Sequence, residues 1–270
     1  MILKSCEEGL WKKKTPMFGS NVLHEACSKG NLKLVKSLIE RGCDKEVKNN
    51  YGYTPLIWAS ANGHLEVVQY LISVGSNKEA KFNEGYTPLI SASRNGKLEV
   101  VKYLISAGAD KEAKEDKGYT PLIYASKNGH LEVVKYLISS GADKEAKDNL
   151  GSTSLMHAAK NGKLEVVKHL ISSDYNKEAK DCNGWTALIW ASFNGQLEVV
   201  KFLISAGADK EATDNHEYTP LICASAKDHL EIVKYLISIG ANKDAKTIGE
   251  ETAIIVAARN VRSYLLSIKE

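Results

Sequence analysis

A 33-residue internal repeat is the feature that most constrains the fold of this chain. The motif Tyr-Thr-Pro-Leu begins at Tyr53 and returns at multiples of 33 residues. Further copies begin at Tyr86, Tyr119 and Tyr218, and weaker ones at Ser152 and Trp185. A fixed period of this length is typical of repeat proteins, in which each repeat is one supersecondary element that stacks on the next. The sequence therefore predicts a stack of similar repeats.

The repeat register divides the sequence into seven repeats and two ends. An early copy that begins at Ser20 lacks the Thr-Pro pair but keeps the later leucine, alanine and glycine positions. The predicted repeats span residues 20–52, 53–85, 86–118, 119–151, 152–184, 185–217 and 218–250. Residues 1–19 are expected to be a degenerate N-terminal capping segment, and residues 251–270 a partial C-terminal capping repeat, because terminal repeats need altered outer faces. Alternatively, Met1 marks a boundary inside a longer protein.

Each repeat carries start and stop signals for two short helices. In the second repeat, Thr54 is the expected N-cap, Pro55 the first helical residue, and Gly63 the end of the helix. A second helix is predicted from Leu65 to Val74, because its apolar residues have helical spacing and Gly75 follows it. Two helices this short cannot bury their apolar faces alone. Neighbouring repeats must therefore stack, and the predicted fold class is all-α.

Composition excludes several classes of function. The 36 basic and 33 acidic residues are spread along the chain and leave a net charge of +3, which gives no strong attraction for nucleic acid or a membrane surface. The sequence has no run of 18 apolar residues and no secretory signal, so an intracellular protein, cytoplasmic or nuclear, is expected. Five cysteines without a Cys-x-x-Cys pair are interpreted as reduced thiols.

The sequence contains no pattern that predicts catalysis or metal binding. Walker, Rossmann, Gly-x-Ser-x-Gly and His-Glu-x-x-His motifs are all absent. His64, His130 and His229 hold the same position in different repeats, and helix layers about 8 to 10 Å apart keep them too distant to share one metal. His157 and His169 form no recognised ligand spacing. We therefore expect no catalytic residues, no metal, no cofactor and no enzymatic activity.

The recurring elements Thr-Pro-Leu, Asn-Gly-His-Leu-Glu-Val-Val and Gly-Ala-Asp at this period resemble the ankyrin repeat family. The resemblance implies an ankyrin-repeat solenoid of helix-turn-helix units joined by β-hairpin-like turns, with the hairpins and first helices lining a concave face that binds partner proteins. One departure concerns the histidine of the family motif. It is kept at His24 and replaced by isoleucine at Ile57, Ile90, Ile123, Ile189 and Ile222.

Positions that differ among the copies are the candidates for partner recognition. Two such positions border the concave face by the family resemblance, and they carry several aromatic and basic residues. With the tyrosines that open two repeats, the candidate partner-binding residues are Trp58, Tyr86, Arg94, Tyr119, Tyr124, Lys127, Lys160, Trp190 and Phe193. Aromatic and arginine side chains are common interface anchors. The alternative is that these rings only pack between adjacent repeats.

The leading functional hypothesis is a non-enzymatic scaffold or adaptor that binds a protein partner on the concave face, with the chain itself a monomer. A first alternative is an interaction module of a larger multidomain protein whose activity lies outside this chain. A second is weak nucleic-acid binding by a basic surface made of Arg94, Lys97, Lys127, Lys160 and Lys163. A spacer without a dedicated partner is a further alternative.

Two local features lead to further predictions. The recurring Asp-Lys-Glu-Ala-Lys segments, such as Asp110 to Lys114, are interpreted as solvated hairpins. In the fifth repeat Asp174 and Tyr175 replace the usual Gly-Ala pair after the second helix. Because aspartate tolerates a left-handed backbone less well than glycine, this repeat is predicted to be a soft point in the stack.

Overall fold

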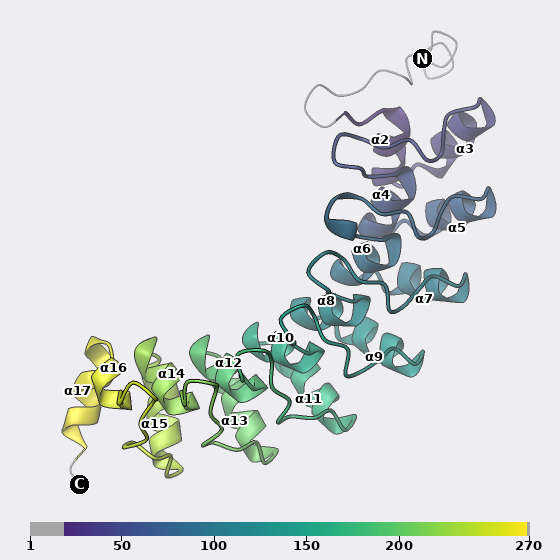
Figure 1. Ribbon diagram of the computed structural model, residues 1–270. Coiled ribbons are helices and arrows are strands. Elements are labelled where there is room, and N and C mark those ends of the chain that lie inside the picture. Colours follow the sequence, from purple (N-terminus) through teal and green to yellow (C-terminus); the bar gives the residue numbers. More distant parts are fainter. Residues whose placement is uncertain (1–18, 269–270) are drawn as a thin grey trace. The chain divides into compact units, whose positions relative to one another are not determined.

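The computed structural model describes residues 19–268. In this part of the chain the secondary structure consists of helices joined by loops, with two isolated bridges and no named strand. The first helices of successive repeats are α2 (Val22–Ser28), α4 (Pro55–Asn62), α6 (Pro88–Arg94), α8 (Pro121–Asn128), α10 (Ser154–Lys160), α12 (Ala187–Phe193) and α14 (Pro220–Ala226). The second helices are α3 (Leu32–Glu40), α5 (Leu65–Ser73), α7 (Leu98–Ser106), α9 (Leu131–Ser139), α11 (Leu164–Ser172), α13 (Leu197–Ser205) and α15 (Leu230–Ser238). The chain ends with α16 (Ala253–Val256) and α17 (Arg259–Ser267), as Figure 1 shows.

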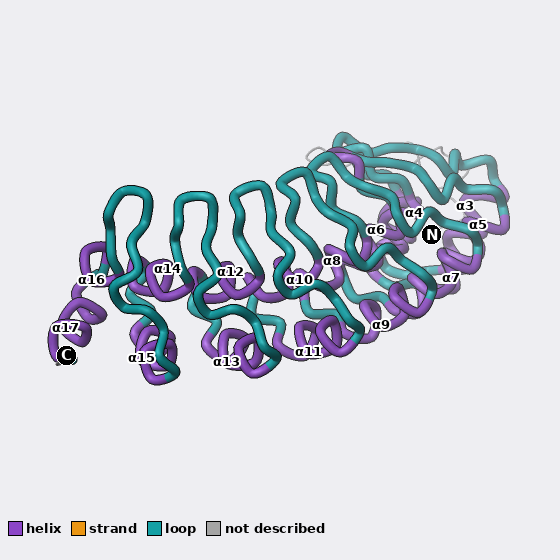
Figure 2. The backbone as a smooth tube through the Cα atoms, turned by 60° about the horizontal axis from the view of Figure 1, so that its bottom comes forward, coloured by secondary structure: helices purple, strands orange, loops and turns teal. Residues whose placement is uncertain are grey.

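The chain forms two compact units. The N-terminal unit runs to Ala125 and includes Glu132–Asp143, and the C-terminal unit contains Ser126–Leu131 and the chain from Lys144 onward. In the N-terminal unit α2, α4 and α6 pack in one row and α3, α5 and α7 in another. In the C-terminal unit α10, α12, α14 and α16 form one row and α11, α13, α15 and α17 the other (Figure 2). The prediction of an all-α fold of stacked helix pairs is confirmed.

The start and stop signals of the second repeat work as predicted. Thr54 Oγ1 accepts a hydrogen bond from the Ile57 amide at 3.4 Å, and α4 begins at Pro55. The helix ends at Gly63, whose φ of 83° is left-handed. The next helix, α5, ends at Ser73, one residue before the predicted end. The exact boundaries of the repeats stay predictions.

The core is a row of aliphatic side chains that repeats through the stack. In the second repeat Ile57, Val68 and Leu71 are completely buried between helices. Isoleucine at the position of Ile57 is fully buried in every other repeat that has it, at Ile90, Ile123, Ile189 and Ile222. His24, by contrast, lies within hydrogen-bond distance of the carbonyls of Val47 and Tyr53, at 3.1 and 2.9 Å. The isoleucines replace this polar link with apolar burial, worth roughly 1.5 to 3 kcal/mol per side chain.

The charged Asp-Lys-Glu segments join one repeat to the next. Lys111 Nζ donates to the carbonyl of Ser140 at the end of α9, at 2.6 Å. The neighbouring Glu112 Oε1 accepts from the Asp143 amide at 2.8 Å. The same two bonds recur along the chain, with lysine donors at Lys45, Lys78, Lys144 and Lys210 and glutamate acceptors at Glu46, Glu79, Glu145, Glu178 and Glu211. The prediction of merely solvated hairpins missed this ladder of bonds between repeats.

The fifth repeat has the predicted backbone. Asp174 has a φ of 60°, a left-handed conformation that costs a residue with a side chain roughly 1 kcal/mol or more. Tyr175, which follows it in place of alanine, is buried. The lower stability of this repeat stays a prediction.

The C-terminal end of the stack is tied to the last repeat. Val261 of α17 is fully buried, and its amide donates to Asp228 Oδ1 at 3.0 Å. Asn260 Nδ2 donates to the other oxygen of Asp228 at 2.6 Å. The capping role of residues 251–270 stays a prediction. The proposed N-terminal capping segment, residues 1–19, lies outside the described residues except for Gly19.

Loss of one bond of the ladder is predicted to destabilise the protein. Lys111→Met keeps the aliphatic stem but removes the donor to Ser140, so the free energy of unfolding in urea should fall by about 1 kcal/mol. Lys117→Met, at an exposed loop tip, is the control and should change it by less than about 0.5 kcal/mol. Equal effects of the two substitutions would show that the ladder contributes nothing.

Candidate functional site

The candidate residues belong to the first helices or to the loops that precede them. We call the surface that these elements form the front face, and Figure 2 shows the elements in each unit. The opposite surface, made by the second helices, is the back face. We describe the front face separately for each compact unit. It differs between the two units in the groups that surround the aromatic rings.

In the N-terminal unit, aromatic side chains form one continuous series on the front face. Trp58 packs on Tyr53 with ring centroids 4.8 Å apart, and Tyr53 on Phe82 at 3.9 Å. Phe82 packs on Tyr86 at 5.0 Å. These three pairs are nearly parallel, with interplanar angles of 21° to 27°. With two further rings the series, which we call the ring stack, consists of Trp58, Tyr53, Phe82, Tyr86, Tyr124 and Tyr119.

The members of the ring stack differ in exposure. Tyr86 and Tyr124 are only 7% and 5% exposed, and their hydroxyl groups hydrogen bond to each other at 2.5 Å. Burial and this hydrogen bond raise the pKa of Tyr124, which stays neutral. Arg94, itself exposed, places its guanidinium carbon 5.5 Å from the Tyr86 ring centroid and 5.7 Å from that of Tyr124. Tyr86 and Tyr124 therefore support the surface from below, while the half-buried rings of Trp58 and Tyr119 are accessible.

In the C-terminal unit, the front face combines rings with ammonium groups. Trp185 packs on Trp190 at 4.4 Å and on Phe193 at 4.9 Å. Lys160 Nζ lies 3.8 Å from the Trp190 ring centroid, and Lys227 Nζ lies 4.5 Å from that of Phe193. Such cation–π contacts at partly exposed sites contribute about 0.5 to 1 kcal/mol each. The structure thus brings together three of the candidate residues, Lys160, Trp190 and Phe193.

Lys127 completes the positive character of this surface. Burial lowers the pKa of Lys160, and the nearby charge of Lys127 lowers it further, whereas Asp148 and Asp181 act in the opposite direction. The two ammonium groups are therefore close enough to repel each other.

Buried carboxylates beneath the front face orient its indole rings. Trp190 Nε1 donates to Asp181 Oδ2, and Trp185 Nε1 donates to Asp214 Oδ2, each at 2.9 Å. The other oxygen of Asp181 accepts from the amides of Asn183 and Trp185 at 2.9 and 3.0 Å. One aspartate therefore holds both a loop and a ring in place.

These carboxylates occupy a position that recurs every 33 residues just before the loop tip. We call it the bracket position, and its members are Asn49, Phe82, Glu115, Asp148, Asp181, Asp214 and Thr247. In every copy except Phe82, a side-chain oxygen accepts from loop amides two or four residues further on. The bracket position therefore closes the loop and, in two copies, orients a tryptophan.

His157 forms a buried pair with one bracket residue. Its Nε2 lies 2.8 Å from Asp148 Oδ2, and both side chains are buried. Burial would raise the pKa of Asp148, but the hydrogen bonds from His157 and from the amides of Ser152 and Leu150 together hold it below its usual value of 3.8. The pair links a loop to the helix α10 and has no second carboxylate or histidine grouped with it for metal binding among residues 19–268.

Other histidines connect repeats. His64 Nε2 lies 2.8 Å from the carbonyl of Ser28, and His229 Nε2 lies 3.0 Å from that of Phe193, in each case one repeat earlier. The structural role predicted for these two residues is confirmed. The four described cysteines, Cys27, Cys43, Cys182 and Cys223, form no disulfide.

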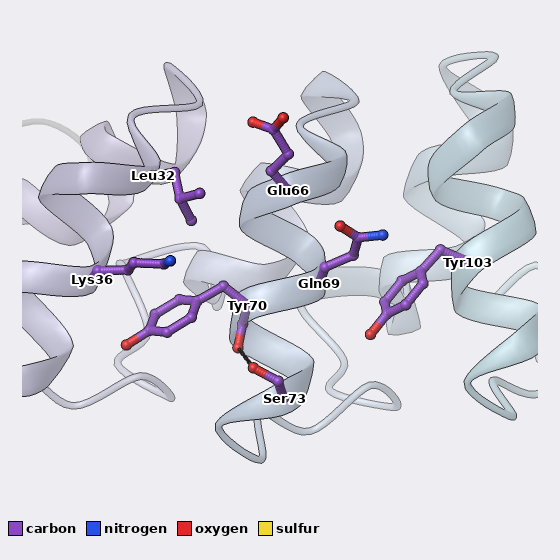
Figure 3. Close-up of a pocket in the computed structure, with 7 residues that line it drawn as sticks. All are labelled: Leu32, Lys36, Glu66, Gln69, Tyr70, Ser73 and Tyr103. Carbon is purple, nitrogen blue, oxygen red and sulfur yellow. Dashed lines mark hydrogen bonds between the residues drawn. The ribbon is translucent and has the colours of Figure 1, made fainter.

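The back face has shallow grooves between successive second helices. One is lined by Leu32, Lys36, Glu66, Gln69, Tyr70, Ser73 and Tyr103, and Figure 3 shows the Tyr70 ring beside Lys36. A second groove, lined by Leu164, Lys168, Glu198, Lys201, Phe202, Ser205 and Tyr235, occupies the equivalent place 132 residues later. Because the groove recurs with the repeat, it follows from helix spacing and does not mark a specific site.

Comparison with known families agrees with this architecture. A model of three ankyrin repeats matches residues 2–82, 74–148 and 142–214, and a single ankyrin-repeat model matches residues 216–248. The chain belongs to the ankyrin-repeat family. Ankyrin repeats are generally non-catalytic modules for protein–protein interaction. A search of curated proteins found no match. No described helix of this ankyrin-repeat chain is long and apolar enough to cross a bilayer.

Sequence reasoning missed three residues of the ankyrin-repeat front face. Asp181 and Asp214 were not considered, because they accept hydrogen bonds from the indoles of Trp190 and Trp185 only once the chain has folded. Phe82 was overlooked because it lies in the loop and outside the variable helix positions. Alignment of the copies contains a signal for it, since Phe82 is the one apolar residue among polar ones at the bracket position.

The Asp148–His157 pair predicts a pH-dependent stability. The pKa of Asp148 in the folded protein lies below 3.8. The contribution of its carboxylate to the free energy of unfolding is therefore complete above pH 3.8 and is lost as the pH falls through the pKa of the folded state. Asp148→Asn should therefore lower the free energy of unfolding by about 2 kcal/mol at pH 7, and this difference should shrink toward pH 2. Urea unfolding at several pH values measures it, with the exposed Asp209→Asn as control. A difference that is constant with pH would contradict the assignment.

Proposed function

We propose that this chain is a non-enzymatic scaffold or adaptor that binds a partner protein on its front face. The observation that carries the proposal is the pair of half-buried indole rings, Trp185 and Trp190, that buried carboxylates hold in place by hydrogen bonds. A surface that is already ordered loses little conformational entropy on binding. Aromatic residues in such a setting are the usual energetic anchors of an interface.

The contacts that the basic side chains make within the stack favour a protein partner over nucleic acid. Lys97 and Lys163, two of the five residues of the basic-surface alternative, lie with their stems against Gly63 and Gly129 of the preceding repeats. Lys160 is partly buried over a ring. These side chains thus serve contacts within the stack, whereas nucleic-acid binding relies on many lysine and arginine contacts to phosphate.

The proposal includes the setting in which the protein works. We place it inside the cell, cytoplasmic or nuclear, and we expect it to act as a monomer. The alternative of an interaction module within a larger multidomain protein leaves the front face with the same role. Any catalytic activity would then belong to the rest of that protein.

Removal of accessible front-face rings is predicted to abolish partner retention. The front variant replaces Trp58, Tyr119, Trp190 and Phe193 with alanine and spares the buried Tyr124, whose loss would disturb folding. Loss of even one anchor worth about 2 kcal/mol weakens binding roughly 30-fold, so proteins captured from a lysate by the wild type should be absent.

A matched back variant controls for the loss of four rings. It replaces the half-buried Tyr70, Tyr103, Phe202 and Tyr235 with alanine and should retain the same proteins as the wild type. Circular dichroism confirms that all variants are folded before capture. Equal retention by the front variant and the wild type would refute the proposed surface.

A further inference from the structure

Phe82 breaks the pattern of the bracket position. In the three copies that are aspartate, Oδ1 accepts from two loop amides, as Asp148 does from Leu150 and Ser152 at 2.9 and 2.8 Å. The equivalent amides after Phe82 belong to Glu84 and Tyr86, and a phenyl ring offers them no acceptor. The loop keeps only its backbone closure, in which the Phe82 amide donates to the Tyr86 carbonyl at 3.2 Å.

The loop after Phe82 contains one left-handed residue with a side chain. Glu84 has a φ of 63°, in the left-handed region that disfavours residues with a side chain. Its counterparts in the other described repeats are Tyr51, Lys117, Leu150, Asn183, His216 and Gly249, and none of these has a positive φ. Two other loops also contain a glutamate with a left-handed backbone, one position later, at Glu217 with a φ of 64° and Glu250 with a φ of 60°. The feature that sets the loop of the second repeat apart is therefore the missing side-chain acceptor.

What the phenyl ring contributes is continuity of the ring stack. Phe82 lies 3.9 Å from Tyr53 and 5.0 Å from Tyr86, so it joins the pair of Trp58 and Tyr53 to the pair of Tyr86 and Tyr124. It is half-buried, and part of the ring reaches solvent on the front face. The loop of the second repeat thus lacks the side-chain hydrogen bonds that close the other loops, and it has an accessible apolar surface instead.

We infer that Phe82 is a partner-binding residue, which contacts an apolar side chain of the protein partner on the front face of the N-terminal unit. The inference rests on the proposed function. The kind of contact follows from the replacement of an oxygen-bearing side chain by a phenyl ring. The ring offers an apolar surface to an apolar group of the partner, and it offers no hydrogen-bond acceptor or charge to a charged group. A residue kept for binding against local stability is expected at a functional site.

The test is a substitution that separates stability from binding. Phe82→Asp restores the residue found at Asp148, Asp181 and Asp214 and thus the acceptor for both loop amides. Its Tm should be equal to or higher than that of the wild type, while retention of the front-face partner should fall at least tenfold. Phe82→Tyr keeps the ring and should bind like the wild type. Phe202→Asp makes the same exchange on the back face and should leave retention unchanged.

Two outcomes would overturn the inference. A fall in the Tm of Phe82→Asp would show that the ring serves the fold, and unchanged retention would show that the partner does not contact it. The front variant distinguishes the two proposals. If that variant loses the partner while Phe82→Asp keeps it, the proposed function stands and only the role of Phe82 fails. If the front variant also binds normally, the proposed function itself is wrong.

Discussion

Stacking of repeats is the constraint on which the rest of this structure depends. A pair of helices of seven to nine residues each has an apolar face on both sides of the pair, and residues such as Ile57 and Val68 become fully buried only when a neighbour covers them. The ladder of Lys111, Glu112 and their equivalents adds hydrogen bonds across the same boundary. Each repeat therefore folds against its neighbours.

This constraint explains where function can reside. A position that must meet the next repeat, such as that of Leu71, is the same residue in all seven repeats, whereas a position on the front face is free to differ. The structure shows that one position in the loop, the bracket position, also serves different purposes in different repeats. The bracket position is used to hold an indole at Asp181, to pair with a histidine at Asp148, and to extend a ring stack at Phe82.

Much of the fold could be predicted from local sequence, because the caps and stops act over a few residues. Thr54, Pro55 and Gly63 define α4 without reference to any other repeat. The ladder and the orientation of Trp190 could not be predicted in this way. Lys111 reaches a carbonyl 29 residues away, and the acceptor of Trp190 lies on a loop before its helix, so both contacts depend on how the elements pack. The burial of Tyr86 and Tyr124 beneath their neighbours likewise emerges only from packing.

The most direct test of the account is hydrogen–deuterium exchange of the chain with and without a partner recovered through it. Binding on the front face should slow exchange of the loop and first-helix amides, notably around Phe82–Tyr86 and Trp185–Phe193, and leave the second helices α7 and α13 unchanged. Protection confined to the second helices, or none on the front face, would contradict the central claim that this surface is the binding site.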